Sequence, residues 1–218
     1  MTAEPIEYEP TIPSRPSAKF VVRARRALRR RRALAAATEV FVARGFHAAT
    51  MDEIAHRAGW SKPILYKEFS GKLELYLAVL QHHIDALTDG VRRALHSTTA
   101  NRDRVRAAIQ AYFDFVDHET QGFRLVFDAN VPSEPSIRWR VGRATDDCVT
   151  AVSTAVAHDS GLSPNRSRML AAGLVGASQF AAQHWLDTGR AVPKADAIAA
   201  VITLCWGGLS SVPLQSTQ

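Results

Sequence analysis

Apolar residues recur at steps of three and four along most of the chain, and no segment alternates as a strand would. The clearest series extends from Leu73 to Leu95 and includes Leu77, Leu80, Ile84, Leu87 and Val91. Such spacing places the apolar side chains on one face of a helix. The pattern therefore predicts an all-α fold, and its interruptions divide the chain into about nine helices.

Glycine, proline and capping residues indicate where these helices begin and end. A first helix is expected over 23–44, closed by Gly45, and the long helix over 73–95 follows two short ones. Beyond it, helices are expected from Asn101, around 123–127, over 137–159, from Ser163 to Gly189 and from Pro193 to Gly207. Serine before proline is typical of a helix start, and glycine is typical of a helix end.

The segment 50–69 predicts two short helices joined by a tight turn. Thr50 and Glu53 form a capping box, which starts the first helix. Gly59 ends that helix, because glycine adopts a left-handed backbone at little cost. Ser61 then caps the second helix, and Pro63 is tolerated in its first turn.

Apolar and polar positions of this segment separate onto two faces. The residues expected in the core are Met51, Ile54, Ala55, Ala58, Ile64, Leu65 and Phe69. Those left on the outer face of the second helix are Ser61, Lys62, Tyr66 and Lys67. A short helix that is held out by a helical partner and carries polar side chains fits the major groove of DNA.

A strongly basic segment directly precedes the two short helices. Residues 19–32 hold eight lysines and arginines and no acid, whereas the whole chain carries a net charge of +6. Such a segment attracts phosphates whatever their sequence, although a solvated helix face or an anionic membrane are alternatives. The residues expected to contact DNA are Arg29, Thr50, Ser61, Lys62, Pro63, Tyr66, Lys67 and Lys72.

The ordered series T-x-x-E, A-G and S-K-P-x-L-Y-x-x-F over residues 50–69 resembles the helix-turn-helix of TetR-family transcription regulators. Trp60 departs from the small aliphatic residue usual in that family, and Lys67-Glu68 departs from a pair that is more often neutral or contains histidine. We expect Trp60 to fill space between helices and Lys67 to alter base preference. A plain helical hairpin is the alternative to this interpretation.

The resemblance implies a division of the chain into three parts. Residues 1–22, which are rich in proline and poor in apolar residues, are expected to be a disordered arm. Residues 23–71 would form the N-terminal helix-turn-helix DNA-binding domain. Residues 72–218 would form a larger helical domain that binds a ligand and makes a homodimer.

Bulky apolar residues are more abundant in the second half than one helical layer requires. Taken singly they are core residues, but as a set they suit a cavity for a long apolar ligand. The residues expected to line it are Tyr112, Phe113, Phe115, Phe123, Phe127, Trp139, Leu174, Phe180 and Trp185. An anionic head group is expected near Arg124, Arg138 or Arg140.

A longer resemblance covers about Arg23 to Leu214 and includes the segments that begin at Phe41, Ser61, Gly71, Asp159 and Trp206. These segments are similar to actinobacterial regulators of fatty-acid synthesis within the same family. That similarity implies an activator of lipid-synthesis genes whose DNA binding is lost when a long-chain acyl-CoA fills each subunit. It also implies dimerisation through the last two helices, where small residues over 171–182 permit close approach. A repressor of an efflux or catabolic operon that senses another apolar compound is the alternative.

Other classes of protein receive little support from the sequence. It contains no G-x-S-x-G, H-E-x-x-H, Walker or G-x-G-x-x-G motif, and its histidines are scattered, so no enzyme, metal site or cofactor is expected. No apolar run reaches roughly 20 residues and no secretory signal is present, so we expect a cytoplasmic protein without a membrane partner. Cys148 and Cys205 are expected to be free thiols.

Overall fold

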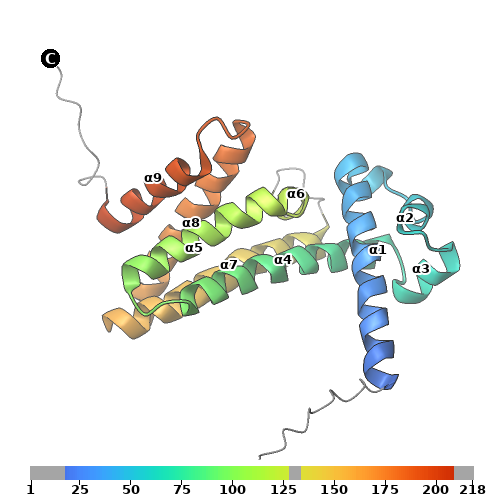
Figure 1. Cartoon of the computed structure of the whole chain (residues 1–218), viewed down its shortest axis with the longest axis horizontal. Coiled ribbons are helices and arrows are strands. Elements are labelled where there is room, and N and C mark those ends of the chain that lie inside the picture. The colour runs from blue at the N-terminus through green and yellow to red at the C-terminus, as the bar shows by residue number, and fades with distance from the viewer. Residues whose placement is uncertain (1–17, 128–133, 209–218) are drawn as a thin grey trace, which may run out of the picture.

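A computed structural model describes residues 18–127 and 134–208, and within them it contains nine helices and no strand (Figure 1). The helices are α1 (Ala18–Ala48), α2 (Met51–Ala58), α3 (Lys62–Glu68), α4 (Lys72–His96), α5 (Asn101–His118), α6 (Thr120–Phe127), α7 (Pro135–Ser160), α8 (Pro164–Asp187) and α9 (Lys194–Gly207). The predicted all-α fold is confirmed.

Helix α1 extends beyond the predicted range at both ends. It starts at Ala18, so residues 18–22 are helical, although they were predicted to belong to a disordered arm. No proline or glycine interrupts these five residues, which allows the arginine-rich helix to continue through them. Residues 1–17 of the predicted arm lie outside the described part of the chain. At the other end Gly45 has φ 71° and ψ 169°, and one further turn follows this kink.

The helices form two groups that share α4 (Figure 1). Helices α1, α2 and α3 pack together at one end, where α1 crosses the start of α4. Further along, α4 packs against α5 and α7, and α8 and α9 cover the other side of α5. Each group has its own buried apolar core, and Phe127 packs against both. Helix α4 therefore belongs to both groups, and α6 also connects them because it packs against α1 as well as α4.

A buried histidine lies where α1, α4 and α6 meet. His83 Nε2 is 3.1 Å from Thr38 Oγ1 on α1, and the Thr38 hydroxyl donates its hydrogen to Leu34 O at 2.9 Å. Nε2 must therefore carry a hydrogen and donate it to Thr38. Gly122 of α6 lies against the same ring, and a Cβ at this position would be 2.2 Å from His83 Nδ1. Glycine at 122 thus permits α6 to pack closely on α4.

Candidate functional site

The turn between α2 and α3 is built by local hydrogen bonds. Glu53 N donates to Thr50 Oγ1 at 3.2 Å, so the predicted N-cap of α2 is confirmed. Ser61 precedes α3 as predicted, but its side chain makes no capping hydrogen bond. Gly59 has φ 66° and ψ 32°, the left-handed conformation expected at the end of α2. The Glu53 carboxylate accepts a hydrogen bond from Arg44 Nε at 3.3 Å, which links α2 to the end of α1.

Two buried side chains attach α3 to the core. Leu65 and Phe69 are at most 1% exposed, in agreement with their prediction. The same prediction for Ile64 is wrong, because Ile64 is 38% exposed. Helix α3 has fewer than two turns, so only side chains four residues apart, here Leu65 and the capping residue Phe69, can face the core together. Ile64, one position before Leu65, therefore points toward solvent.

The outer face of α3 brings together most of the residues that were predicted to contact DNA. Ser61, Lys62, Pro63 and Lys67 are exposed, and Tyr66 is 43% exposed although its neighbour Leu65 is fully buried. Thr50 is also exposed, but it lies at the start of α2 and its hydroxyl caps that helix. The side chains of α3 that remain available form a compact polar surface.

The acidic side chains near this surface are paired with bases of the same protein. Lys62 Nζ lies 2.9 Å from Asp52 Oδ1, and the hydrogen bond to Asp52 raises the pKa of Lys62. Arg26 of α1 lies 3.4 Å from Glu68. These pairs are exposed and individually weak, so nearby phosphates can compete for the bases.

Three arginines of α1 contact residues in or beside α3. Arg26 contacts Glu68, the Arg29 guanidinium lies 5.6 Å from the centre of the Trp60 ring, and Arg30 lies 4.7 Å from that of Phe69. The half-buried Trp60 thus fills space between helices, as expected, and also supports Arg29. Positions Arg26 and Arg30 were missed by the sequence analysis, because only the fold shows which face of α1 meets α3.

The basic edge of α1 continues past the contact with α3. Lys19, Val22, Arg23 and Arg26 line a shallow surface hollow there. Lys19, Arg23, Arg26 and Arg30 are spaced by three or four residues, so they share one face of the helix. This face extends the polar surface of α3 by a run of positive charge.

Lys72 occupies a more internal position than the prediction assumed. Its Nζ donates to the carbonyl oxygens of His47 and Ala49 at 2.9 and 3.0 Å, and it lies 5.0 Å from the centre of the Phe46 ring. A lysine ammonium has three hydrogens, so one is left for a phosphate. Lys72 therefore holds the end of α1 to the start of α4, and this structural role is independent of any contact that it makes with DNA.

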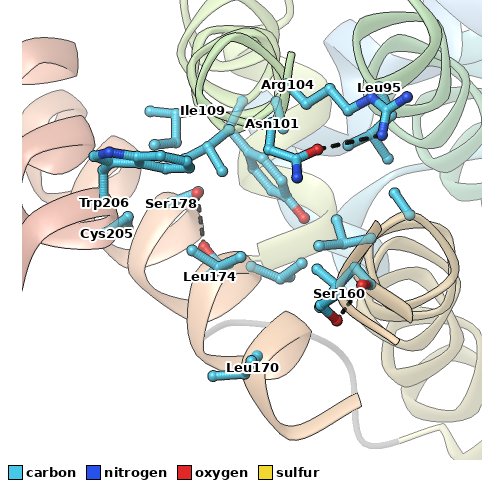
Figure 2. A pocket seen from close by; sticks show the side chains of 17 residues that line it. Leu95, Asn101, Arg104, Ile109, Ser160, Leu170, Leu174, Ser178, Cys205 and Trp206 are labelled. Carbon is cyan, nitrogen blue, oxygen red and sulfur yellow. Dashed lines mark hydrogen bonds between the residues drawn. The ribbon is translucent and has the colours of Figure 1, made fainter. Parts of the chain in front are cut away.

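An apolar hollow lies between α5, α7, α8 and the end of α9 (Figure 2). Leu95 also lines it, in the last turn of α4, and this end of α4 is remote from α3 (Figure 1). Its volume is about 330 Å³, within the usual range for small-molecule sites. Much of its wall is small or aliphatic and includes Ala108, Ile109, Val152, Ala155, Leu174 and Val175. Figure 2 shows Trp206 and Cys205 on one side and Arg104 with Asn101 on the other.

The predicted ligand-binding residues fall into three groups. Tyr112 and Leu174 line the hollow. Four others are buried in the core that surrounds it: Phe113, Phe115, Phe123 and Trp185. Phe127 is half-buried between the two cores, while Trp139 and Phe180 are 62% and 71% exposed and do not line the hollow.

Small residues in the wall of the hollow were missed by the sequence analysis. A cavity forms where side chains such as Ala108 and Ala155 are too short to meet, whereas aromatic residues fill space. The cationic residue on the wall is also different from those predicted, because it is Arg104 and not Arg124, Arg138 or Arg140. Arg140 instead donates to Gln81 Oε1 at 2.8 Å.

The hydroxyl of Tyr112 is buried in the wall of the apolar hollow. It has no nitrogen or oxygen partner among the described residues, and its polar neighbour is the Cys148 thiol, a weak hydrogen-bond acceptor. Burial, with a smaller effect of Cys148, raises the pKa of Tyr112 well above its ordinary value, so the hydroxyl keeps its hydrogen. A buried hydroxyl whose neighbour is only a weak acceptor carries a free-energy cost, and a stronger acceptor such as a carbonyl oxygen would reduce that cost.

Helices α8 and α9 expose large apolar side chains on the outside of the subunit. Met169 is 75% exposed, Phe180 71%, Trp206 50% and Leu204 42%. Small residues separate them on α8, and a Cβ added at Gly173 or Gly176 would meet nothing within 4 Å. Apolar exposure of this extent commonly marks a protein–protein contact.

The described residues contain no group of three or more histidine, cysteine, aspartate or glutamate side chains that could hold a metal ion. None of the helices in the described ranges is both long and apolar enough to span a bilayer. Cys148 and Cys205 are free thiols, as predicted.

Comparison with protein-family models gives two matches. Residues 33–79 match the family described as bacterial regulatory proteins, tetR family, and residues 101–208 match a tetracyclin repressor-like C-terminal domain. Among curated proteins, the HTH-type transcriptional activator FasR of Mycolicibacterium smegmatis is 53% identical over 186 residues, which cover 85% of each chain. The HTH-type regulator SrpR of Pseudomonas putida is 48% identical over 59 residues, or 26% of this chain and 28% of its own.

Solved structures agree with this assignment. A tetR-family regulator from Streptomyces coelicolor superposes with a TM-score of 0.67 at 26% identity and covers 84% of this chain and 81% of its own. FadR from Bacillus subtilis, solved in complex with stearoyl-CoA, superposes with a TM-score of 0.70 over 82% of this chain and 98% of its own, and at 14% identity it shows the fold alone. The chain belongs to the TetR family of bacterial transcriptional regulators.

Proposed function

We propose that this regulator is a homodimer that binds an operator of lipid-synthesis genes and releases it when a long-chain acyl-CoA enters the apolar hollow of each subunit. The observation that carries the proposal is that hollow, with the buried hydroxyl of Tyr112, which has no nitrogen or oxygen partner among the described residues, in its wall. It lies in the same chain as an exposed DNA-reading surface, and the 53% identity to FasR extends over both parts. An apolar wall with one placed polar group is typical of a site for a small molecule with an apolar body.

In the proposed complex, α3 enters the major groove. Tyr66 and Ser61 offer hydroxyl groups that donate or accept hydrogen bonds, and Lys67 adds a flexible donor. The basic face of α1 that includes Arg23 and Arg26 would contact phosphates beside the groove. Phosphate contacts position the protein, whereas contacts of α3 with base edges would supply the sequence preference.

The exposed apolar faces of α8 and α9 support a two-fold dimer. Burying Met169, Phe180 and Leu204 against a second copy would remove apolar surface from water, which favours association. A two-fold arrangement would place two copies of α3 about 34–36 Å apart, one turn of DNA. The expected operator is accordingly an inverted repeat.

In each subunit the acyl chain would occupy the hollow and the ligand carbonyl would accept a hydrogen bond from Tyr112. The wall formed by Ile109, Val152 and Val175 suits a methylene chain, since every buried methylene contributes about 0.8 kcal/mol. Free coenzyme A has no such chain and should bind much more weakly. Affinity should therefore rise with the length of the acyl chain until the hollow is full.

Helix α4 provides a physical connection between ligand and DNA. Its first residue, Lys72, holds the end of α1, and Leu95 in its last turn forms part of the wall of the hollow. A ligand that binds better to one position of α4 shifts the population toward that position. The proposed mechanism requires that, in this position of α4, the two copies of α3 in the dimer are no longer spaced to enter successive major grooves of the DNA.

Calorimetric titration of the purified protein tests the ligand part of the proposal. We expect long-chain acyl-CoA to bind with one molecule per subunit and a negative heat-capacity change, because apolar surface is buried. Free coenzyme A at the same concentration should give no comparable heat. If acyl-CoA does not bind while another apolar compound does, the acyl-CoA assignment is wrong and the protein senses that compound.

A further inference from the structure

A second hollow of about 520 Å³ adjoins the apolar one near the end of the bundle remote from α3. It lies between the last turns of α4, the first turns of α5 and the second half of α7, and it is lined by Arg92, His96, Arg104, Asp147, Thr150 and His158 among others. Two guanidinium groups, two imidazoles and hydroxyl groups thus face one space. We refer to this space as the cationic hollow.

The two hollows share part of their walls. Leu95 of α4, Arg104 of α5 and Ala155 of α7 line both of them. Figure 2 shows Arg104 and Leu95 at the side of the apolar hollow opposite Trp206, so the cationic hollow lies beyond that side. A molecule with an apolar tail and a charged head could therefore extend from one hollow into the other past Arg104.

The charges of the cationic hollow favour an anionic occupant. Among the described residues that line it, the carboxylate is Asp147, which lies 3.6 Å from Arg143, and Arg92 lies 3.7 Å from Asp89. Both pairs are long and solvent-exposed, so they neutralise the site only weakly. At its rim Arg168 of α8 donates to Thr150 Oγ1 at 3.2 Å and pairs with Asp146, so this pair adds hydrogen-bond donors without adding net charge.

Arg104 is held where the two hollows meet. Its Nε donates to Thr98 O at 2.9 Å and its Nη1 lies 3.5 Å from Asn101 Oδ1. These contacts order the guanidinium before any ligand arrives, which lowers the conformational entropy lost on binding. A guanidinium presents several N–H groups in one plane, and this geometry matches phosphate oxygens.

We propose that the cationic hollow binds the phosphate-bearing end of the effector, with Arg92 and Arg104 as the main phosphate contacts and the acyl chain in the apolar hollow. This inference rests on the proposed function, because it assumes an effector that joins an apolar chain to phosphates. It assigns the orientation of that effector, with its head toward the ends of α4 and α7. It also implies that the protein distinguishes an acyl-CoA from the free fatty acid of the same length.

The test compares the binding of palmitoyl-CoA and of palmitate to variants of the full-length protein. Arg92→Gln and the double variant Arg92→Gln/Arg104→Gln remove one and two cations from the cationic hollow. Arg93→Gln, the next position of α4, removes an exposed cation that lines neither hollow and serves as the matched control. Circular dichroism and thermal melting establish that each variant is folded.

We expect the Kd for palmitoyl-CoA to rise about ten-fold in the double variant and by a smaller factor in Arg92→Gln, because charge-assisted hydrogen bonds to phosphate are lost. The Kd for palmitate and the behaviour of Arg93→Gln should remain as in the wild type. If replacement of Arg104 prevents folding, the Arg92→Gln variant, whose side chain is half exposed, decides the question.

Two outcomes would contradict this inference in distinguishable ways. Tight binding of palmitoyl-CoA by the wild type and equally tight binding by the Arg92 variants would overturn the cationic hollow alone. Failure of the wild type to bind palmitoyl-CoA at all would overturn the proposed function, and this inference with it.

Discussion

His83 is predicted to make the protein less stable in weak acid, and replacement by glutamine should remove that dependence. His83 is only 5% exposed, and burial, with a smaller effect of His82, lowers its pKa from 6.5 to about 4. Glu119 Oε2 lies 3.4 Å from His83 Nδ1 and favours the imidazolium. The Glu119 side chain is half exposed, however, so water screens it and burial has the larger effect.

Whether acid raises or lowers the free energy of unfolding depends on which state, folded or unfolded, binds more protons. Between pH 6.5 and pH 4 the unfolded chain binds a proton at His83 that the folded chain does not bind. Acidification through this window therefore favours unfolding. With a pKa of about 4 in the folded state and 6.5 in the unfolded state, titration of His83 lowers the free energy of unfolding by about 2 kcal/mol between pH 7 and pH 5. The loss reaches about 3 kcal/mol once the pH falls below 4.

The assay is urea denaturation at pH 7 and pH 5, at a fixed protein concentration because dimerisation would also stabilise the fold. A His83→Gln variant can still donate to Thr38, but it does not titrate. The free energy of unfolding of the wild type should fall about 2 kcal/mol further than that of the variant between the two pH values. His56→Gln, at an exposed position of α2, is the control and should follow the wild type.

Parallel pH curves for wild type and His83→Gln would refute this reasoning. A wild type that gains stability relative to the variant on acidification would show that Glu119 holds a charged imidazolium and that burial is the smaller effect.

Four further predictions address the DNA surface, the ligand and the dimer. Tyr112→Phe should weaken the binding of long-chain acyl-CoA about five-fold in calorimetry, with little loss of free energy of unfolding, because the polar neighbour of the hydroxyl is only the weakly accepting Cys148 thiol. Tyr66→Ala should remove the preference for operator over random DNA in anisotropy measurements at nearly unchanged Tm, whereas Leu65→Ala, at a fully buried position, should cost about 2–5 kcal/mol of stability. Arg23→Gln should reduce the slope of log K against log salt concentration by about one and leave sequence preference intact. Phe180→Glu should yield monomers in analytical ultracentrifugation, because a charge would be buried at the proposed contact of α8.

Each of these four predictions has a distinct contradicting result. An unchanged acyl-CoA affinity of Tyr112→Phe would remove its hydroxyl from the ligand site, and unfolding of Tyr66→Ala would make Tyr66 a core residue. A salt dependence of Arg23→Gln identical to that of the wild type would leave the end of α1 without a phosphate contact. A stable dimer of Phe180→Glu would place the subunit contact elsewhere.

Local features were predictable from the sequence because their causes are local. Thr50 caps α2 by a hydrogen bond to a residue three positions later, and Gly59 and Gly161 both adopt the left-handed conformation that ends a helix. The apolar face of α4 follows from the spacing of its residues alone, and its buried residues include Leu80, Leu87 and Val91. The order of the helices, and their approximate limits, could be predicted for the same reason.

Features that depend on packing between distant segments were not predictable in this way. The apolar hollow is formed by residues of five helices, and its shape depends on where small residues such as Ala108 and Ala155 face one another. Lys72 binds carbonyl oxygens 23 and 25 residues away, which no spacing rule indicates. Phe180 lies on the outside of α8 because the inner side is taken by Ala171, Val175 and Ala182.

The central claim is that a long-chain acyl-CoA releases this regulator from DNA. It is tested most directly by fluorescence anisotropy of the protein on a labelled fatty-acid-synthase promoter fragment, at fixed salt, during titration with palmitoyl-CoA. Free coenzyme A is the matched control, since it carries the same phosphates without the acyl chain. The account predicts specific binding that is lost with palmitoyl-CoA and retained with coenzyme A. Specific binding that is indifferent to palmitoyl-CoA at concentrations that fill the site would contradict it.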